Sequence, residues 1–421
     1  GGQRPVARVG AAAAPAGEAP PAVIGRLRAF VHRQVGAYLQ APGDGRRAPA
    51  IPAATLLWSL LAGYLLREGA FHAVEALVRS PARRRLGVRH PFGDDTLAYF
   101  TERLAIPPLR TALAQLIRAA KRRKAFDDVW RIGLVLDGTT VGRCPTVRCP
   151  ACQPILVPHR DAAGQPTPFA SVVGQQHKLS LLAVVGGAVH LPVDLEPYGP
   201  GDSELAASLR LLDRGVAALG VRFAQYVLGD GLYANVPFLH AAGDHGLRAL
   251  VRLKGNLPAL FAAAQARFED TPPGATFEDH GDRVEVWDAD DFDPWEDLRW
   301  PTVRVFRYRQ THPDGTVIHA YWVTDFSARQ VSSQTLYRLA KGRWTIENQG
   351  FNDGKTRYGL DHVPHHEANS LLIHWLLVLL TLTLERLYRL RFLHRGAHAP
   401  VPSITLVRPL RLGLEPAVVH S

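Results

Sequence analysis

Three acidic residues lie in sequence settings that suit metal-dependent chemistry on phosphate. Asp137 and Asp230 each follow an apolar run and precede a glycine, and Glu347 lies far downstream in a stretch with a polar face. Three carboxylates from distant segments form a hard oxygen ligand set, which holds Mg²⁺ and leaves positions for water and phosphate. Two such ions about 4 Å apart would activate a nucleophile and stabilise the leaving oxygen of a phosphoryl transfer. For each Asp taken alone, an ordinary turn or helix cap explains the Asp-Gly pair equally well.

Two basic residues accompany the glutamate. Arg343 lies four residues before Glu347, which puts both side chains on one face of a helix predicted over 334–355. Lys355 lies eight residues after Glu347, which is roughly 80° round the axis of an α-helix from it. A carboxylate flanked by cations suits a metal site that handles phosphate. The simpler alternative is an amphipathic helix whose charges are solvated.

The elements that must position these residues follow from the periodicity of the chain. Apolar runs at 132–136 and 223–228 predict buried strands that end at Asp137 and Asp230. Residues 178–186 and 189–195 predict a hairpin with a Gly-Gly turn beside the first strand. A sheet that places the two acid-bearing strands side by side brings both carboxylates to one edge. The helix that carries Glu347 can cover that edge.

The rest of the chain predicts helices before this sheet and a strand-rich insertion within it. Strands are expected at 283–287, 302–310 and 317–324, and an apolar helix over 367–389 is expected to pack beneath the sheet. The basic tail after residue 395 is expected to be loose. The predicted divisions are a disordered tail (1–22), a helical DNA-binding domain (23–128), a core in two parts (129–257 and 331–395), a β insertion (258–330) and a C-terminal tail (396–421).

A basic cluster closes the last helix predicted before the sheet. It consists of Lys121, Arg122, Arg123 and Lys124, at the end of a helix over 109–124. Cations in a last turn complement the helix dipole, which is a purely structural explanation. The formal net charge of the chain is +11, and such a balance favours polyanionic partners, most often nucleic acid. We therefore favour contact of this cluster with DNA, although a coding bias towards arginine accounts for part of the arginine excess.

Composition places the chain among globular proteins without membrane contact. Its 421 residues are 47% hydrophobic and 21% charged, enough for two or three domains with a sizeable core. The first twenty residues contain no apolar segment of a signal peptide. The most apolar run, 371–384, contains His374 and is too short to span a bilayer, so it predicts a buried helix. By elimination we expect a cytoplasmic protein.

The three cysteines are gathered in one short stretch, so they cannot build a disulfide scaffold and they fit a reducing compartment. Cys144, Cys149 and Cys152 have the content of a zinc site, and a tetrahedral site needs a fourth ligand such as His159 or His177. The alternative is three free thiols in a loop. For His177 the alternative is a buried histidine of the core.

Taken together, these residues resemble the DDE transposases of bacterial insertion sequences, in the class with a β insertion before the catalytic glutamate. The resemblance covers about residues 92–391 and includes His177-Lys178 and the segment Gly201-Asp202-Ser203-Glu204, which leads into a helix. The spacing of Arg343 and Glu347 matches the family signature.

The chain departs from that signature at two positions. The tyrosine expected three residues before Arg343 is Ala340, although Tyr337 lies one turn earlier. The basic residue expected seven positions after the glutamate is Gly354, and Lys355 follows it. The form Glu-Asn-x-Gly-Phe-Asn-x-x-Lys is similar to that of a subgroup, so we expect Lys355 to contact DNA phosphate.

The resemblance implies an α/β fold: an RNase H-like catalytic core, a β insertion subdomain and an N-terminal all-helical DNA-binding domain. It implies that Asp137, Asp230 and Glu347 hold two Mg²⁺ or Mn²⁺ ions. Water would attack the phosphodiester at the element end, and the freed 3′-hydroxyl would attack target DNA. The implied partners are the inverted repeats, target DNA and a second copy of the chain, in the bacterial nucleoid. A Trp of the insertion could stack an unpaired base; the candidates are Trp287, Trp295, Trp300 and Trp322.

Two other functions remain open at this stage. A catalytically silent relative would bind DNA without cutting it. A metal-dependent nuclease would cut DNA without joining it to a target.

Overall fold

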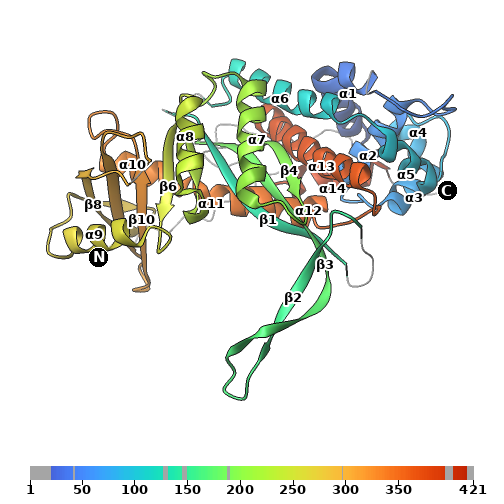
Figure 1. The fold of residues 1–421 in the computed structure, drawn as a ribbon. Coiled ribbons are helices and arrows are strands. Elements are labelled where there is room, and N and C mark those ends of the chain that lie inside the picture. The colour runs from blue at the N-terminus through green and yellow to red at the C-terminus, as the bar shows by residue number, and fades with distance from the viewer. Residues whose placement is uncertain are drawn as a thin grey trace, which may run out of the picture.

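The computed structural model describes residues 20–40, 43–126, 131–144, 149–186, 190–295, 297–393 and 402–414. Within them, ten strands form one mixed sheet flanked by helices (Figure 1). Five strands make its central part, in the spatial order β4-β3-β1-β5-β6. β3 is antiparallel to both of its neighbours, whereas β5 is parallel to β1 and to β6. These strands are β1 (Gly133–Cys144), β3 (Pro166–Val185), β4 (Leu191–Tyr198), β5 (Tyr226–Gly229) and β6 (Arg248–Leu253).

Both faces of this central sheet are buried, because successive side chains of a strand point to opposite faces. Leu134 and Leu136 of β1 join one core cluster, together with α7 (Glu204–Leu219) and α8 (Val236–Asp244). Val135 joins the other cluster, which contains the helices around Glu347 and α13 (Ala368–Tyr388). Ser203 caps the start of α7 by accepting a hydrogen bond from Ala206 N at 3.1 Å.

The strand-rich insertion is present, but it extends the central sheet. β10 (Val317–Thr324) pairs antiparallel with β6, and β9 (Val303–Thr311), β8 (Asp282–Phe292) and β7 (Ala275–Asp279) follow outward. The three predicted strands correspond to β8, β9 and β10. β7 and helix α9 (Pro258–Glu269) were not predicted.

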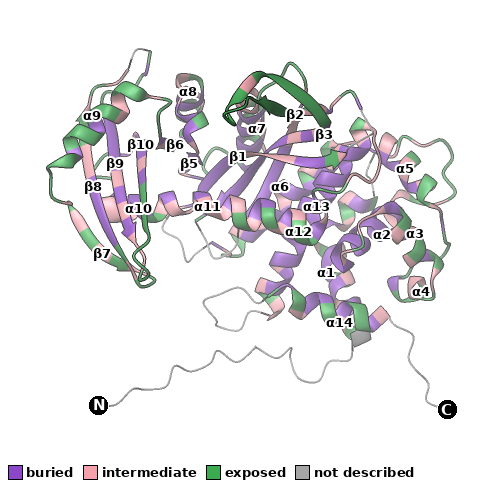
Figure 2. Cartoon of the chain, turned by 90° about the horizontal axis from the view of Figure 1, so that it is seen from below, coloured by how far each residue is buried: buried purple, intermediate pink, exposed green. Residues whose placement is uncertain are grey.

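A long ribbon is the largest difference from the expected strands. β3 begins at Pro166, twelve residues before the predicted start, and it pairs with β2 (Gln153–Arg160), which was not predicted. The ribbon projects from the body of the protein (Figure 1), and Figure 2 shows it largely exposed. Pro154 and Pro158 are compatible with a strand here because β2 lies at the edge of the sheet, where a missing N–H costs no pairing.

The helices predicted before the sheet are present and share a core cluster with α13. α6 also contacts α7 and β4. Arg110 of α6 donates to Asp194 of β4 at 3.0 Å, and Arg214 of α7 donates to the same carboxylate at 2.5 Å. The helices are α1 (Pro20–Gln40), α2 (Ala53–Leu66), α3 (Phe71–Arg79), α4 (Ala82–Leu86), α5 (Asp94–Arg103) and α6 (Pro107–Arg122).

The apolar C-terminal helix is longer than its sequence predicts. α13 continues as a π-helix, Arg389–Leu393. Among the described residues, the stretch Ala368–Leu393 is long and apolar enough to cross a membrane by length and composition, with a mean hydropathy of 1.6. However, 89% of the 18-residue window that gives this hydropathy is buried inside the protein, as in a core helix. The prediction of a buried helix is therefore confirmed, but its argument from insufficient length is wrong.

The tail predicted to be loose contains one more helix, α14 (Ile404–Leu414). Leu406 and Leu410 are buried in the core, and Arg411 donates to Leu66 O of α2 at 2.7 Å. Apolar residues at helical spacing pack this segment against the N-terminal helices. The prediction of a loose tail relied on its basic residues and prolines and overlooked this spacing. The predicted N-terminal tail lies outside the described residues, except for its last residues, which begin α1.

Candidate active site

The register of the two parallel strands places Asp137 beside Asp230. Val135 of β1 pairs with Leu228 of β5, and each aspartate follows two residues later. Asp230 comes directly after β5 and accepts a hydrogen bond from Leu232 N at 2.8 Å, as the cap of a short 3-10 helix, Gly231–Tyr233. The sequence predicted that Asp137 ends its strand, and this prediction is wrong. β1 continues to Cys144, because its far half pairs with β3.

Glu347 lies on a π-helix, Ile346–Asn352, between α11 (Arg343–Thr345) and α12 (Asp353–Tyr358). A π-turn closes i→i+5 bonds and often marks a functional site. The buried Arg386 of α13 stabilises it from below by donating to Gln349 O and, at 2.9 Å, to Asp353 Oδ2. A carbonyl of the irregular helix thereby receives a charged donor.

Arg343 connects the strand to this helix. Its Nη1 lies 2.7 Å from Glu347 Oε1 and 3.5 Å from Asp137 Oδ2, and its side chain is only 8% exposed. The predicted shared face of Arg343 and Glu347 is therefore confirmed. The guanidinium holds the glutamate next to Asp137, which the sequence placed more than 200 residues away.

A fourth carboxylate, Glu204, belongs to the same group and was not predicted as a site residue. It is the first residue of α7, and a Cβ at Gly138 would lie 2.2 Å from its carboxylate. Tyr233 donates to Glu204 Oε1 at 3.0 Å and Tyr198 to Oε2 at 3.3 Å. The available signal was the segment ending at Glu204, which the family resemblance already included.

The crowding of these carboxylates has an electrostatic consequence. Burial raises the pKa of Asp137 to about 7, and the charges of Asp230, Glu204 and Glu347 act in the same direction. Arg343 opposes this shift. Arg252 is also near enough for its charge to act on Asp230 and Glu347. The four carboxylates still outnumber these two guanidinium groups, and a divalent cation would supply the missing positive charge. The oxygen donor set also fits Mg²⁺ or Mn²⁺ by its chemistry.

Lys355 lies against β1 just beyond Asp137. Its Nζ donates to Thr139 Oγ1 at 2.8 Å and to Thr140 O at 2.7 Å. A π-turn takes in more residues than an α-turn, so the helix rotates through a smaller angle between Glu347 and Lys355 than we expected. This brings the lysine nearer to the face of the glutamate. Burial, followed by the charge of Arg143, lowers the pKa of Lys355, which Asp361 partly offsets.

A pocket of about 610 Å³ opens between Lys355 and Glu204, next to Asp137 in the chain at Gly138. Three cations line it, together with backbone and hydroxyl groups of β1. Glu204 and Asp361 add negative charge to its wall. The cations are Arg143, Lys178 and Lys355.

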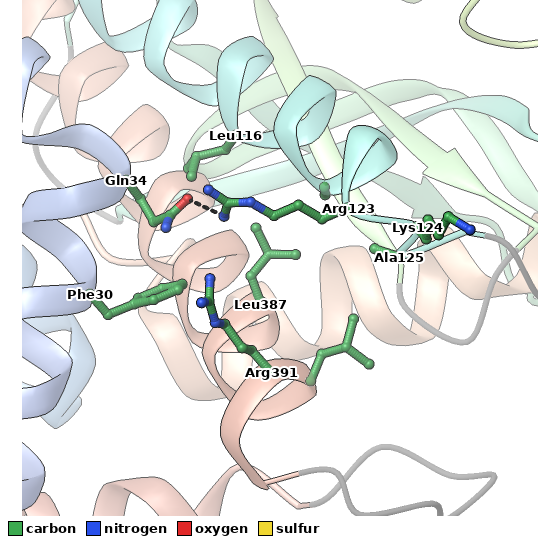
Figure 3. A pocket seen from close by; sticks show the side chains of 10 residues that line it. Phe30, Gln34, Leu116, Arg123, Lys124, Ala125, Leu387 and Arg391 are labelled. Carbon is green, nitrogen blue, oxygen red and sulfur yellow. Dashed lines mark hydrogen bonds between the residues drawn. The ribbon is translucent and has the colours of Figure 1, made fainter.

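The basic cluster predicted to contact DNA lies elsewhere. Lys121 donates to Phe223 O at 2.6 Å, just before β5 begins, whereas Asp230 lies beyond the other end of that strand. Figure 3 shows Arg123 bonded to Gln34 of α1, a contact of 3.0 Å, at a pocket that Arg391 also lines. The pocket measures about 700 Å³. Arg122 and Lys124 are exposed, so the cluster and the carboxylates are on different parts of the molecule.

The predicted zinc ligands are only partly brought together. Cys149 and Cys152 contact each other and His177. Cys144 is near enough for its charge to act on Cys152, whose pKa is raised by burial and by the neighbouring thiols. His159 is on the exposed ribbon, where Nε2 lies 2.6 Å from Ser171 Oγ. His159 is therefore wrong as the fourth ligand, because β2 carries it away from the cysteines.

The tryptophans of the insertion differ in burial. Trp322 is fully buried, and Trp287 is 6% exposed and donates to Thr271 O at 2.6 Å. These two side chains therefore belong to the core. Trp295 and Trp300 are partly buried.

Comparison with known proteins identifies the family of the chain. Among solved structures, the chain is similar to a piggyBac transposase synaptic complex with hairpin DNA, at 9% identity and a TM-score of 0.41. That match covers 96% of this chain and 83% of the other. No curated protein matches. The family model of the transposase DDE domain matches residues 131–384, more than half of the chain, and this span contains all four carboxylates. The chain therefore belongs to the family of transposases with a DDE domain.

Proposed function

We propose that this transposase cleaves DNA at the ends of a mobile element and joins the freed 3′-hydroxyl to target DNA. One observation carries the proposal: Asp137, Asp230 and Glu347 converge where β5 ends beside β1, inside the matched domain. The order β4-β3-β1-β5-β6, with β5 and β6 parallel to β1, supports an RNase H-like core.

Asp137, Asp230 and Glu347 would hold two Mg²⁺ or Mn²⁺ ions, with Glu204 close by. Bound there, the ions supply Lewis acidity and a reactive hydroxide at neutral pH. Arg343 keeps the Glu347 carboxylate turned towards Asp137. Tyr198 and Tyr233 fix both oxygens of Glu204. These contacts pre-orient the oxygen donors, so little reorganisation is needed when phosphate arrives.

The pocket beside the carboxylates suits the DNA backbone. Lys355, Arg143 and Lys178 can neutralise phosphates flanking the scissile bond. Lys355 takes the role expected of the signature basic residue, and the π-helix supports this because it offsets the one-residue displacement in sequence. The DNA partners would be the inverted repeats and the target, held by two copies of the chain because two ends must be paired. Trp295 or Trp300 could stack an unpaired base, and Lys121, Arg122, Arg123 and Lys124 would contact DNA away from the cutting site.

The deciding experiment is an end-cleavage and joining assay in Mg²⁺ or Mn²⁺, on DNA carrying the flanking inverted repeats. Wild type is compared with Asp230→Ala and with Asp213→Ala, a control that changes an exposed aspartate of α7. We expect cleavage and joining by wild type and the control, and neither by Asp230→Ala. Cleavage without joining would favour the nuclease. Binding without cleavage in all three proteins would favour the silent DNA-binding relative.

A further inference from the structure

A second group of metal-ligand side chains lies apart from the carboxylates, at the base of the ribbon. Cys149 and Cys152 belong to the connection between β1 and β2, His177 to β3, and His366 to the connection between α12 and α13. Donor atoms of Cys149, Cys152 and His366 all lie within 4.8 Å of one another. The sequence separates the first and last of these residues by more than 200 positions.

Distances within the group approach those around a tetrahedral ion. The two Sγ atoms are 3.4 Å apart, and His177 Nε2 lies 3.2 Å from Cys149 Sγ and 3.4 Å from Cys152 Sγ. Bonds of about 2.0–2.3 Å in tetrahedral geometry separate neighbouring ligand atoms by about 3.3–3.8 Å.

Three members of the group are buried, and the fourth, His366, is half-buried. Cys149 is 5% exposed, and Cys152 and His177 are each 2% exposed. The ring of Trp375 meets His177 edge-on, with centroids 5.7 Å apart. His366 Nδ1 is buried and has no hydrogen-bond partner among the described residues. A buried ring nitrogen of this kind costs free energy unless it binds something.

Local backbone geometry also favours thiolate ligands. The N–H of Cys149 points to Cys152 Sγ at 3.4 Å, and Cys152 N donates to Cys149 O at 3.0 Å. The Cys-x-x-Cys turn thus directs both sulfurs to one side. On β1, Gly142 adopts φ 61°, and a Cβ at this position would lie 2.6 Å from Val363 Cγ2 and 3.1 Å from His177 Nδ1. A larger residue here would therefore crowd both side chains.

We propose that Cys149, Cys152, His177 and His366 bind one Zn²⁺ in a closed structural site. Two thiolates and two imidazoles select zinc over the hard ions that suit the carboxylate edge. The ion would fasten three segments: the base of the ribbon, β3, and the loop that follows the helix of Glu347. It would therefore hold the far half of β1 against the connection between α12 and α13. Cys144 and His159 are not ligands in this arrangement.

The test uses the full chain, produced in zinc-supplemented medium and purified under reducing conditions. Metal content is measured by mass spectrometry for wild type, Cys149→Ser, His366→Ala and the control His159→Ala. We expect about one zinc per chain in wild type and in the control. Residues that only support a ligand change metal affinity by about 10–100-fold when mutated. Loss of a ligand itself should weaken zinc retention against a chelator by at least that factor.

Co²⁺ substitution gives a second readout that does not need a folded variant. Wild type loaded with Co²⁺ should show visible absorption typical of tetrahedral thiolate coordination, and zinc should displace it. No metal in wild type, or octahedral Co²⁺ spectra, would overturn the site. Zinc retained by His366→Ala but lost from His159→Ala would overturn this ligand set. Because metal content is read without DNA, failure of the proposed transposition would leave the result unchanged.

Discussion

The two groups of metal-ligand side chains lie near different parts of β1, and they differ in donor chemistry and in exposure to solvent. Near the middle of β1, Asp137 joins a set of hard carboxylates beside a pocket lined with cations. Beyond its far end, Cys149 and Cys152 join the buried His177 and the half-buried His366. An open site with uncompensated negative charge can admit water and phosphate, whereas a closed site with soft donors stabilises the fold. One sheet thus carries a site suited to catalysis and a site suited to stabilising the fold.

The largest expected effect comes from removing a carboxylate at the open site. Asp137→Asn should lower end cleavage by at least about 10²–10³-fold, because a lost electrostatic contact to the transition state costs several kcal/mol. In metal-free protein the same change should raise Tm. The folded-state pKa of Asp137 is raised to about 7, so its charged form destabilises the fold at pH 8.

Differential scanning fluorimetry in EDTA and in Mg²⁺ checks this prediction beside the cleavage assay. Mg²⁺ should raise Tm of wild type more than that of the variant. Asp213→Ala, on the exposed side of α7, is the control and should respond to Mg²⁺ as wild type does. A variant that melts earlier than wild type in EDTA would contradict the crowding of like charges.

The next effect concerns the closed site, where removing a ligand should lower Tm and not raise it. Cys149→Ser should lower Tm, because a ligand that binds only the folded state at 1,000 times its Kd contributes about 4 kcal/mol. A strong chelator should lower Tm of wild type to that of the variant, and added zinc should restore only wild type. Equal Tm values with and without the chelator would show that no ion supports this part of the fold.

Glu204 offers a sharper distinction within the open site. Glu204→Gln keeps the shape and the acceptor for Tyr233 but removes the charge, so cleavage should fall by about 10–100-fold and need more Mg²⁺. Tyr233→Phe, which leaves the charge in place, should have the smaller effect. Titration of cleavage rate against Mg²⁺ measures both. An unchanged Mg²⁺ requirement in Glu204→Gln would remove this carboxylate from the metal site.

The smallest effects separate the two basic regions. Lys355→Ala should weaken binding of end DNA and reduce the salt slope by about 1, as expected for one phosphate contact. Lys121→Ala should change the salt slope less, and it should also cost about 1 kcal/mol of stability, because the ammonium group of Lys121 donates to Phe223 O. Binding measured across salt concentrations, with urea unfolding of both variants, checks this pair. A larger salt-slope change for Lys121→Ala would place DNA on the far end of the sheet.

Much of the open site could be predicted, because its signals are local. A short apolar run followed by Asp-Gly marks a strand and its end, and the four-residue spacing of Arg343 and Glu347 marks one helical face. Glu204 escaped prediction because one acidic residue at a helix start is common and its partners Tyr198 and Tyr233 belong to different segments. The ribbon escaped because its prolines oppose a strand unless that strand is an edge, and edges are defined by the whole sheet.

By itself, the sequence determined the three acids, the class of chemistry they suit, the main strands and the helical start of the chain. These depend on periodicity and residue type, which are properties of short segments. Only the tertiary structure decided that His366, and not His159, lies beside the cysteines, that a π-helix turns Lys355 towards Glu347, and that residues 404–414 form a packed helix. Each of these depends on contacts between segments far apart in the chain, and no local pattern encodes such contacts.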